Sequence, residues 1–296
     1  MDMIKINGHS YYIPGNTNVG VYTYKNGYCL LVDSGINNTA GRKISEALTG
    51  NGFKPRYIVN THAHTDHYGA DHILRELYPG LAIYASPIES AFMRHNELES
   101  YTLYGAVPYK GVKDEMFYAR ETPVDGEIAP GEVEFDDRVF TVVPLRGHTA
   151  GQIGLITEDR VAYIGDALFD ERRLNIYVPF LYDIEAEYRT LDLLENIEAD
   201  YYVLGHADKV YDDIKPLVKL NRDTIYEYIE IISELLDQPK TLEGLASEVF
   251  ILKDIRIDHR YYYTCMAGIK AFVSYLLDRE EIACDIQDGK LILYNS

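Results

Sequence analysis

The stretch THAHTDHYGADH, residues 61–72, places four histidines and two aspartates within twelve positions, directly after the apolar run RYIVN at 56–60. Within it, the pattern H-x-H-x-D-H is formed by His62, His64, Asp66 and His67. Alternate residues of an extended or turning loop point the same way, so the first two histidines can bind one ion. The aspartate and the third histidine would then face a second position, ahead of a helix that begins near Gly69. A solvated, histidine-rich loop is the alternative, but this spacing favours metal ligands.

Three later residues share one local context, a glycine at the carboxyl end of an apolar run. His148 stands in LRGHTAGQIG, Asp166 in YIGDALF and His206 in VLGHAD. The sheets of α/β proteins present functional side chains at this end of their strands. Each residue alone fits an ordinary loop position as well as it fits a ligand. Their recurrence in the same context favours one shared site.

Taken in order, these motifs resemble those of the metallo-β-lactamase superfamily, which includes glyoxalase II and its relatives. The resemblance spans roughly residues 8–210 and rests on H-x-H-x-D-H, G-H-T, G-D and G-H, together with LVDSG at 31–35. It implies an αββα sandwich, an α/β fold in which two sheets pack back to back with helices outside.

The resemblance also implies a role for each residue. One metal ion would be bound by His62, His64 and His148. A second would be bound by Asp66, His67 and His206. Asp166 would bridge the two ions, and Asp33 would support the site without being a ligand. Asp66 is expected to be catalytic as well, because it can orient the nucleophile or accept its proton.

The ligand chemistry agrees with this assignment. Five imidazoles and two carboxylates without a thiolate suit zinc, and they tolerate iron or manganese. We therefore expect two divalent ions, with zinc as the default. Two ions about 3.5–4 Å apart can hold a shared hydroxide as the nucleophile, because bound water reaches a pKa of about 7. Such chemistry needs no serine or cysteine nucleophile, and the sequence offers no convincing triad.

Short apolar, β-branched runs with Gly, Asn or Asp at their ends predict strands in the first 210 residues. They lie at 28–33, 56–60, 81–85, 138–145, 152–157, 160–165 and 200–205. Helical patterns lie at 39–49, 69–78 and 185–197. Helices mixed with nearly continuous apolar strands indicate an α/β architecture with covered sheets. We expect a catalytic domain over residues 1–214.

Residues 215–296 have a different pattern. An amphipathic helix follows Pro216, a second begins at 241–250 with Thr241 as its cap, and a third covers 259–277. The last segment, 282–294, predicts a hairpin that turns at Gln287-Asp288-Gly289. This order suggests a small, mostly helical, winged-helix-like C-terminal domain.

The charge of this tail argues against DNA binding. It contains ten Lys and Arg against fourteen Asp and Glu, a net charge of −4, and its third helix offers only Arg260 and Lys270 as cations. Affinity for a duplex grows with the number of phosphates neutralised. We therefore expect the tail to pack against the catalytic domain or to form a homodimer, and to help wall the active-site entrance.

Composition narrows the remaining classes. The formal net charge of −19 disfavours nucleic-acid binding in general. No apolar stretch approaches the ~18 residues of a membrane span, and the N-terminus does not have the pattern of a secretory signal. Three scattered cysteines fit a reducing compartment. These features together predict a cytoplasmic protein without a membrane segment.

The sequence also offers candidate substrate contacts. The sequence predicts that an insertion at about 90–125 forms a lid-like loop with short helical turns. Its tyrosines either line an aromatic pocket or pack a local core: Tyr101, Tyr104, Tyr109 and Tyr118. Arg172 and Arg173 follow Asp166 closely, so they would meet an anionic substrate unless they are solvated surface residues. Tyr68, next to the H-x-H-x-D-H motif, is a further candidate.

The leading functional expectation is a metal-dependent hydrolase that uses a dinuclear metal-bound hydroxide on a small-molecule ester, thioester, lactone or phosphoester. The alternative is a nuclease or other nucleic-acid-processing metallohydrolase that binds its polymer through the C-terminal domain. A metal-binding protein without turnover is disfavoured by the complete ligand set. Within the superfamily, His64 disfavours the redox diiron branch, which has an acidic residue there. DHYGAD also departs from the D-H-x-G-G of glyoxalase II, whose basic glutathione-binding residues have no convincing counterpart.

Overall fold

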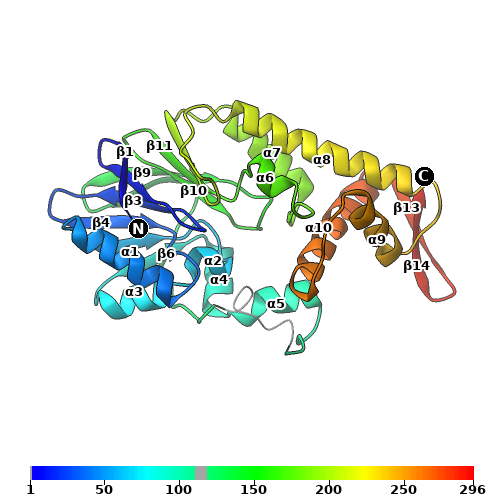
Figure 1. The fold of residues 1–296 in the computed structure, drawn as a ribbon, viewed down its shortest axis with the longest axis horizontal. Helices are drawn as coiled ribbons and strands as arrows, with labels where there is room; N and C mark the ends of the chain where they lie inside the picture. Colours follow the sequence, from blue (N-terminus) through cyan, green and yellow to red (C-terminus); the bar gives the residue numbers. More distant parts are fainter. Residues whose placement is uncertain (1, 111–118) are drawn as a thin grey trace.

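The computed structural model describes residues 2–110 and 119–296. Two β-sheets lie face to face, and helices cover the outer surface of each (Figure 1). This is the predicted αββα sandwich, with a mostly helical C-terminal region beside it. The described residues include Tyr101, Tyr104 and Tyr109 of the insertion, whereas the predicted pocket residue Tyr118 lies outside them.

The first sheet contains seven strands in sequence order. They are β1 (Ile4–Asn7), β2 (Ser10–Ile13), β3 (Val19–Thr23), β4 (Tyr28–Val32), β5 (Lys54–Val59), β6 (Ala82–Ala85) and β7 (Gly126–Glu127). Strands β1 to β4 are antiparallel, and β4 to β7 are parallel. The apolar run at 28–33 is continuous because both faces of β4 are buried: Leu30 contributes to the core between the sheets, and Leu31 to the core under the outer helices.

The second sheet has the order β12-β11-β10-β9-β8. Its strands are β8 (Gly131–Phe135), β9 (Arg138–Pro144), β10 (Ile153–Ile156), β11 (Val161–Gly165) and β12 (Tyr201–Leu204). All neighbours are antiparallel except β11 and β12, which run parallel. The carboxyl ends of β11 and β12 therefore meet at one edge of this sheet.

Aromatic rings fill much of the space between the sheets. Tyr22 of β3 packs edge-on against Phe140 of β9, with ring centroids 5.0 Å apart. Tyr163 of β11 donates a hydrogen bond of 2.7 Å to the Tyr11 carbonyl oxygen across the interface. A Cβ on Gly20 would lie 2.5 Å from the Tyr163 ring, so glycine makes room for it. Part of the tyrosine content of the chain thus serves the core.

Three of the outer helices were predicted, at 39–49, 69–78 and 185–197, and the others were not. Helices α1 (Asn38–Gly50), α3 (Asp71–Leu77) and α4 (Pro87–Arg94) cover the first sheet, and α6 (Glu171–Leu174) and α7 (Ile184–Leu194) lie over the second. The helix predicted at 69–78 is present as α3, but the loop expected before it contains a separate helical turn, α2 (Thr65–Tyr68). A Cβ on Gly69 would lie 2.0 Å from the Ile36 carbonyl oxygen, which explains why a glycine ends this helical turn.

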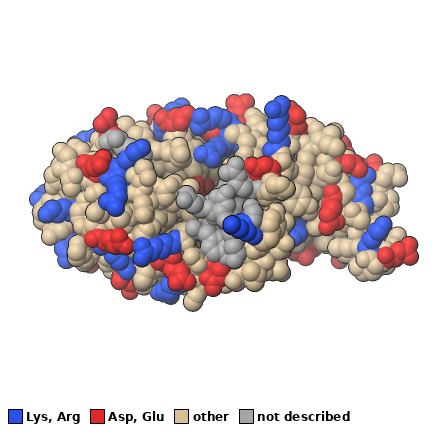
Figure 2. All heavy atoms as spheres, turned by 60° about the horizontal axis from the view of Figure 1, so that its bottom comes forward, with Lys and Arg blue, Asp and Glu red and all other residues tan. Residues whose placement is uncertain are grey.

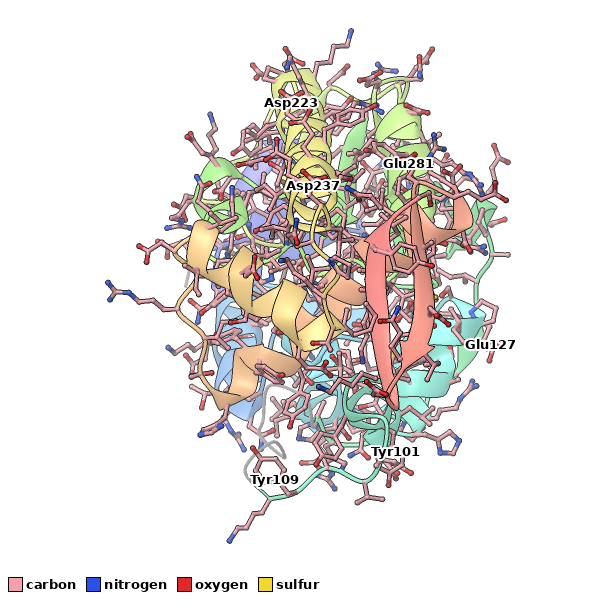
Figure 3. All side chains as sticks on the ribbon, turned by 90° about the vertical axis from the view of Figure 1, so that its right-hand side faces the viewer. Tyr101, Tyr109, Glu127, Asp223, Asp237 and Glu281 are labelled. Atoms are coloured by element: carbon pink, nitrogen blue, oxygen red, sulfur yellow. The ribbon has the colours of Figure 1, made fainter. Side chains whose placement is uncertain are left out.

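The tail has the predicted order of elements. It contains α8 (Lys215–Leu235), α9 (Leu242–Leu252), α10 (His259–Asp278), β13 (Ile282–Gln287) and β14 (Lys290–Asn295). Thr241 caps α9 by accepting a 3.1 Å hydrogen bond from the Gly244 N–H. Asp288 and Gly289 both have positive φ, as a two-residue hairpin turn requires. Figure 3 shows the hairpin at the end of the molecule, beside α9 and α10. The winged-helix description stays a prediction.

The tail shares a hydrophobic core with the second sheet. Ile164 of β11, Leu191 of α7, Val218 of α8 and Phe272 of α10 belong to one cluster of buried residues. Tyr228 of α8 also stacks on Phe272, with ring centroids 5.4 Å apart. The predicted boundary at residues 214 and 215 therefore falls at the start of α8, within a continuous core.

Charges on the surface are mixed. On the face displayed in Figure 2, Lys and Arg side chains alternate with Asp and Glu side chains. Among the residues that the structure describes, no helix is both long enough and apolar enough to cross a membrane.

Candidate metal centre

The predicted ligands converge at one edge of the sandwich. His62, His64, Asp66 and His67 follow β5 of the first sheet, whereas His148, Asp166 and His206 follow β9, β11 and β12 of the second. A side chain in place of the glycine before these later ligands would clash with neighbouring residues. A Cβ on Gly205 would lie 2.1 Å from Asp166 Oδ1, and one on Gly147 would lie 2.1 Å from Glu187 Oε2. Glycine thus lets these loops approach each other closely.

Three histidines form the first group. Nδ1 of His64 lies 3.0 Å from Nε2 of His62 and 2.9 Å from Nε2 of His148. The ligand atoms of this group lie within 4.8 Å of one another. Three nitrogen atoms therefore surround one position, as a zinc ion with three imidazole ligands requires.

The second group lies beside the first. His206 Nε2 lies 3.1 Å from Asp66 Oδ2 and 3.3 Å from Asp166 Oδ2. His67 Nε2 lies 3.3 Å from Asp166 Oδ1, and His148 Nε2 lies 3.7 Å from Asp166 Oδ2. Asp166 thus touches histidines of both groups. This is the geometry of a carboxylate that can bridge two ions.

The outward-facing nitrogen atoms of several rings have fixed partners. Nδ1 of His67 lies 2.8 Å from a carboxylate oxygen of Asp33, which also accepts hydrogen bonds from Thr61. Nδ1 of His148 bonds to the Phe180 carbonyl oxygen at 2.8 Å, and Nδ1 of His206 to that of Asn16 at 2.6 Å. Carboxylates and carbonyl groups in this position fix the tautomer of metal-binding histidines. Asp33 therefore lies where a supporting residue is expected.

The side chains fit a pair of cations. Nε2 of His67 and Oδ1 of Asp166 are buried without a hydrogen-bond partner among the described residues, although buried polar atoms are nearly always satisfied. Burial would lower the pKa of His67, but Asp166 and Asp33 outweigh it and raise the pKa well above its usual value. In the same way Asp166 raises the pKa of His206 to about 9 against the effect of burial. The carboxylates thus stabilise positive charge in the second group. Bound divalent cations would supply that charge.

The three histidines of the first group have lowered pKa values instead. Burial lowers the pKa of His64 to about 3, and the neighbouring His148 contributes to this shift. Burial likewise lowers the pKa of His148 and holds that of His62 well below its usual range. These rings are therefore neutral, which is the state in which imidazole binds a metal ion.

Two functional neighbours were missed by the sequence reasoning. Glu89 of α4 accepts hydrogen bonds from the Ala63 N–H at 2.8 Å, the Gly151 N–H at 2.8 Å and the Thr149 hydroxyl at 2.7 Å. One carboxylate thus joins the loop of His62 and His64 to the loop of His148. Glu99 of α5 (Glu97–Tyr104) places Oε1 3.7 Å from Nε2 of His64. Neither residue lies in a recognisable motif, so only the fold reveals these contacts.

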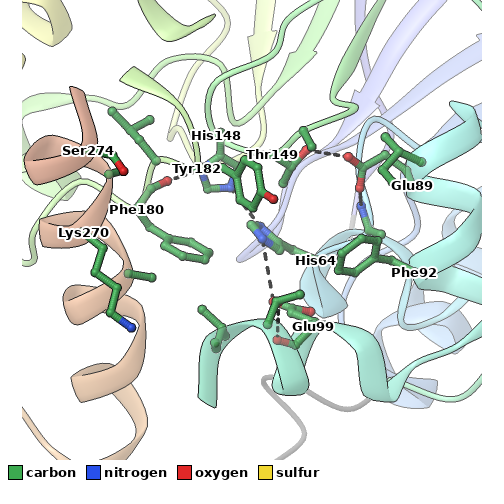
Figure 4. Close-up of a pocket in the computed structure, with 18 residues that line it drawn as sticks. His64, Glu89, Phe92, Glu99, His148, Thr149, Phe180, Tyr182, Lys270 and Ser274 are labelled. Carbon is green, nitrogen blue, oxygen red and sulfur yellow. Dashed lines mark hydrogen bonds and ion pairs between the residues drawn. The ribbon is translucent and has the colours of Figure 1, made fainter. Parts of the chain in front are cut away.

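A pocket of about 300 Å³ opens beside the first group (Figure 4). Its residues come from α4, α5, α10 and the loops that carry His64, His148 and Phe180. Half of them are apolar: Ala63, Ile88, Phe92, Leu103, Ala150, Phe180, Leu181, Ala267 and Ala271. The size and apolar lining are typical of a small-molecule site.

The predicted substrate contacts lie outside the described lining of this pocket. Tyr68 is buried in the core beneath the first sheet. Tyr104 packs edge-on against Tyr263 of α10, with ring centroids 5.0 Å apart. Arg172 and Arg173 are exposed on α6, and Arg172 lies 3.4 Å from Asp208. None of the four is among the residues that line the pocket in the described part of the chain, and their contact with substrate stays a prediction.

Comparison with known proteins places this arrangement in a family. The family model described as "Metallo-beta-lactamase superfamily" matches residues 12–206, which include every ligand candidate. The chain belongs to the metallo-beta-lactamase superfamily. The resemblance inferred from the sequence motifs is thereby confirmed.

Individual known proteins are similar over part or nearly all of the chain. An uncharacterized protein of Aquifex aeolicus is 32% identical over 148 residues, which are 49% of this chain and 62% of that protein. The hydroxyacylglutathione hydrolase GloC of Haemophilus influenzae is 30% identical over 115 residues, 38% of this chain and 50% of that enzyme. The match thus spans less than two thirds of either relative. A solved metallo-beta-lactamase family protein from Thermus thermophilus shares the fold over 97% of this chain and 99% of its own, with a TM-score of 0.76 and 20% identity.

Proposed function

We propose that this chain is a metal-dependent hydrolase that acts on a small-molecule ester, thioester, lactone or phosphoester. The observation that supports this most strongly is the convergence of five imidazole rings and two carboxylates from separate loops. Their ligand atoms form three overlapping groups, each within 4.8 Å. We further propose two divalent ions, with zinc as the default and iron or manganese as alternatives, because seven donors exceed the needs of one tetrahedral site.

The residues of the site have separable tasks. Two divalent ions, when bound, supply Lewis acidity and lower the pKa of a water molecule to about 7. The side chain of Asp66 is 35% exposed, whereas that of Asp166 is 6% exposed. The more exposed carboxylate of Asp66 is therefore the better placed of the two to orient an incoming water molecule or to take its proton. The apolar walls of the pocket keep bulk water from the acyl group.

A thioester is the first substrate class to test. The relative from Haemophilus influenzae carries the name of a hydroxyacylglutathione hydrolase, and a hydroxyacylglutathione is a thioester. The apolar pocket beside His64 and His148 suits an acyl group better than it suits a sugar or a nucleotide.

The test combines metal analysis with a panel of thioesters, esters, lactones and phosphodiesters. We expect two ions per chain. The variants His62→Ala, Asp66→Asn and Asp166→Asn should lose hydrolysis of every accepted substrate, whereas Cys284→Ser, at an exposed position in β13, should keep it. A stoichiometry of one ion that is unchanged in Asp66→Ala or His206→Ala would defeat the two-ion proposal. Full turnover by Asp66→Asn with both ions present would exclude the role given to Asp66.

A further inference from the structure

The described lining of the pocket combines apolar, acidic and neutral polar residues with one cation. Lys270 of α10 is the single Lys or Arg among its described lining residues, and its side chain is exposed. In Figure 4 the ammonium group of Lys270 points toward α5 across the pocket. No described carboxylate lies close enough to Lys270 for a salt bridge. The chain has a net charge of −19, so most of its surface repels anions. A cation at the rim of the pocket can therefore favour ligands that carry a negative charge.

The acidic groups of the pocket are engaged elsewhere. Both carboxylate oxygens of Glu89 accept hydrogen bonds from the ligand loops. Glu99 faces His64, with Oε1 3.7 Å from Nε2. Among the described residues, Lys270 therefore has no acidic partner in the pocket, and its ammonium group is available to a charged group of a ligand.

The positions of these groups define a ligand with three parts. His64 and His148 lie at the reacting end, where the scissile carbonyl group would sit. Apolar side chains such as Phe92, Leu103 and Phe180 form the walls beyond them. Lys270 stands at the exposed rim, where a charged group can keep part of its hydration. The pocket volume of about 300 Å³ limits the ligand to a short chain.

We propose that the preferred substrate carries a short apolar acyl chain that ends in a carboxylate, and that Lys270 selects this carboxylate. The inference rests on the proposed hydrolase function and names its substrate class. A single ammonium group matches the single charge of a carboxylate. A phosphate monoester carries about −1.5 to −2 at neutral pH and would leave charge unpaired next to Glu99.

The experiment compares two thioesters of the same thiol, one with an adipoyl group and one with a hexanoyl group. They differ only in the terminal carboxylate. We expect kcat/KM to be about fivefold higher for the adipoyl thioester, which is the upper range for an exposed ion pair. The ratio should fall to about one in Lys270→Met, reverse in Lys270→Glu and persist in Lys270→Arg. Lys290→Met is the matched control, because it removes an exposed lysine of the hairpin and should leave the ratio unchanged.

Binding of the corresponding thioethers separates this inference from the proposed function. Thioethers are not hydrolysed, so calorimetric titration of the purified, metal-loaded protein reports on the pocket alone. Tighter binding of the carboxylate-bearing thioether, lost in Lys270→Met, would support the inference even if neither thioester were hydrolysed. Equal binding of the two thioethers, or a preference that survives in Lys270→Met, would overturn it.

Discussion

Single buried carboxyl groups control much of the pH behaviour expected of this molecule. Glu187 of α7 is 3% exposed, and its Oε2 atom has no hydrogen-bond partner among the described residues. Burial raises the pKa of Glu187 to about 8. The folded protein therefore keeps a proton on this group that the unfolded chain releases above its ordinary pKa of about 4.3.

This difference predicts how Glu187→Gln changes stability with pH. As the pH rises from about 5 to 8, the unfolded state loses the proton first, so the wild-type free energy of unfolding should fall by up to ~1.4 kcal/mol per pH unit. The amide of the variant has no such proton to lose, so the variant should gain stability relative to the wild type toward pH 8. Urea unfolding at several pH values measures the trend. Glu185→Gln on the exposed side of the same helix serves as the control, and an identical pH profile for wild type and Glu187→Gln would refute the prediction.

At the scale of elements, α4 holds two ligand loops in register. Glu89 near its N-terminus is the contact between them, and it lies outside the strands that the sequence identifies as carrying ligands. Removing the carboxylate would leave two buried N–H groups without an acceptor, at a cost of about 1–3 kcal/mol each.

Glu89→Ala should therefore weaken one metal position more than the other. We expect the affinity at the His62, His64 and His148 group to fall by about 10- to 100-fold, as for other supporting residues of metal sites. Stepwise removal of metal by a chelator, followed by elemental analysis, would show one ion released early. Glu89→Gln keeps one acceptor oxygen and should give an intermediate result. Release of both ions in parallel, as in the wild type, would show that Glu89 does not position this group.

The elements also show what the sequence can and cannot reveal. All seven strands predicted from apolar runs are present. Such runs are needed most where both faces are buried, as in β11, whereas β9 alternates between buried and exposed residues. Strands β1, β2 and β3 were not predicted, since tyrosine, glycine and polar residues interrupt their apolar pattern. The ligands were identified because they cluster in short motifs. The sequence did not predict the roles of Glu89, Glu99 and the Asn16 carbonyl group, because their contacts depend on how distant segments pack and not on local spacing.

At the scale of the whole molecule, the charge distribution opposes contact with polyanions. The tail contributes a net charge of −4, and the acidic residues Asp223, Asp237 and Glu281 lie on its surface (Figure 3). Lys270, one of the two cations of α10, lines the pocket instead of an outer face of the tail.

The intact protein is therefore expected not to bind nucleic acid. Phosphate contacts supply most of the non-specific affinity for DNA, and on the face displayed in Figure 2 the cations are interspersed with acidic residues. Fluorescence titration with duplex DNA and structured RNA at low salt should show no binding at micromolar protein. Salt-sensitive binding in that range would contradict the prediction and favour the nuclease alternative.

The contact between α5 and α10 has a consequence for how this protein could diversify. The proposed metal ligands all lie before residue 210, whereas one wall of the pocket comes from α10, beyond residue 258. The ring of Tyr104 in α5 packs against the ring of Tyr263 in α10, and neither residue is a proposed metal ligand. One wall of the pocket is thus encoded apart from the proposed metal ligands, whereas the other walls are encoded among them. Recombination or drift in the segment for α10 can generate new specificities on an unchanged reaction centre, which makes this helix the natural target for directed evolution.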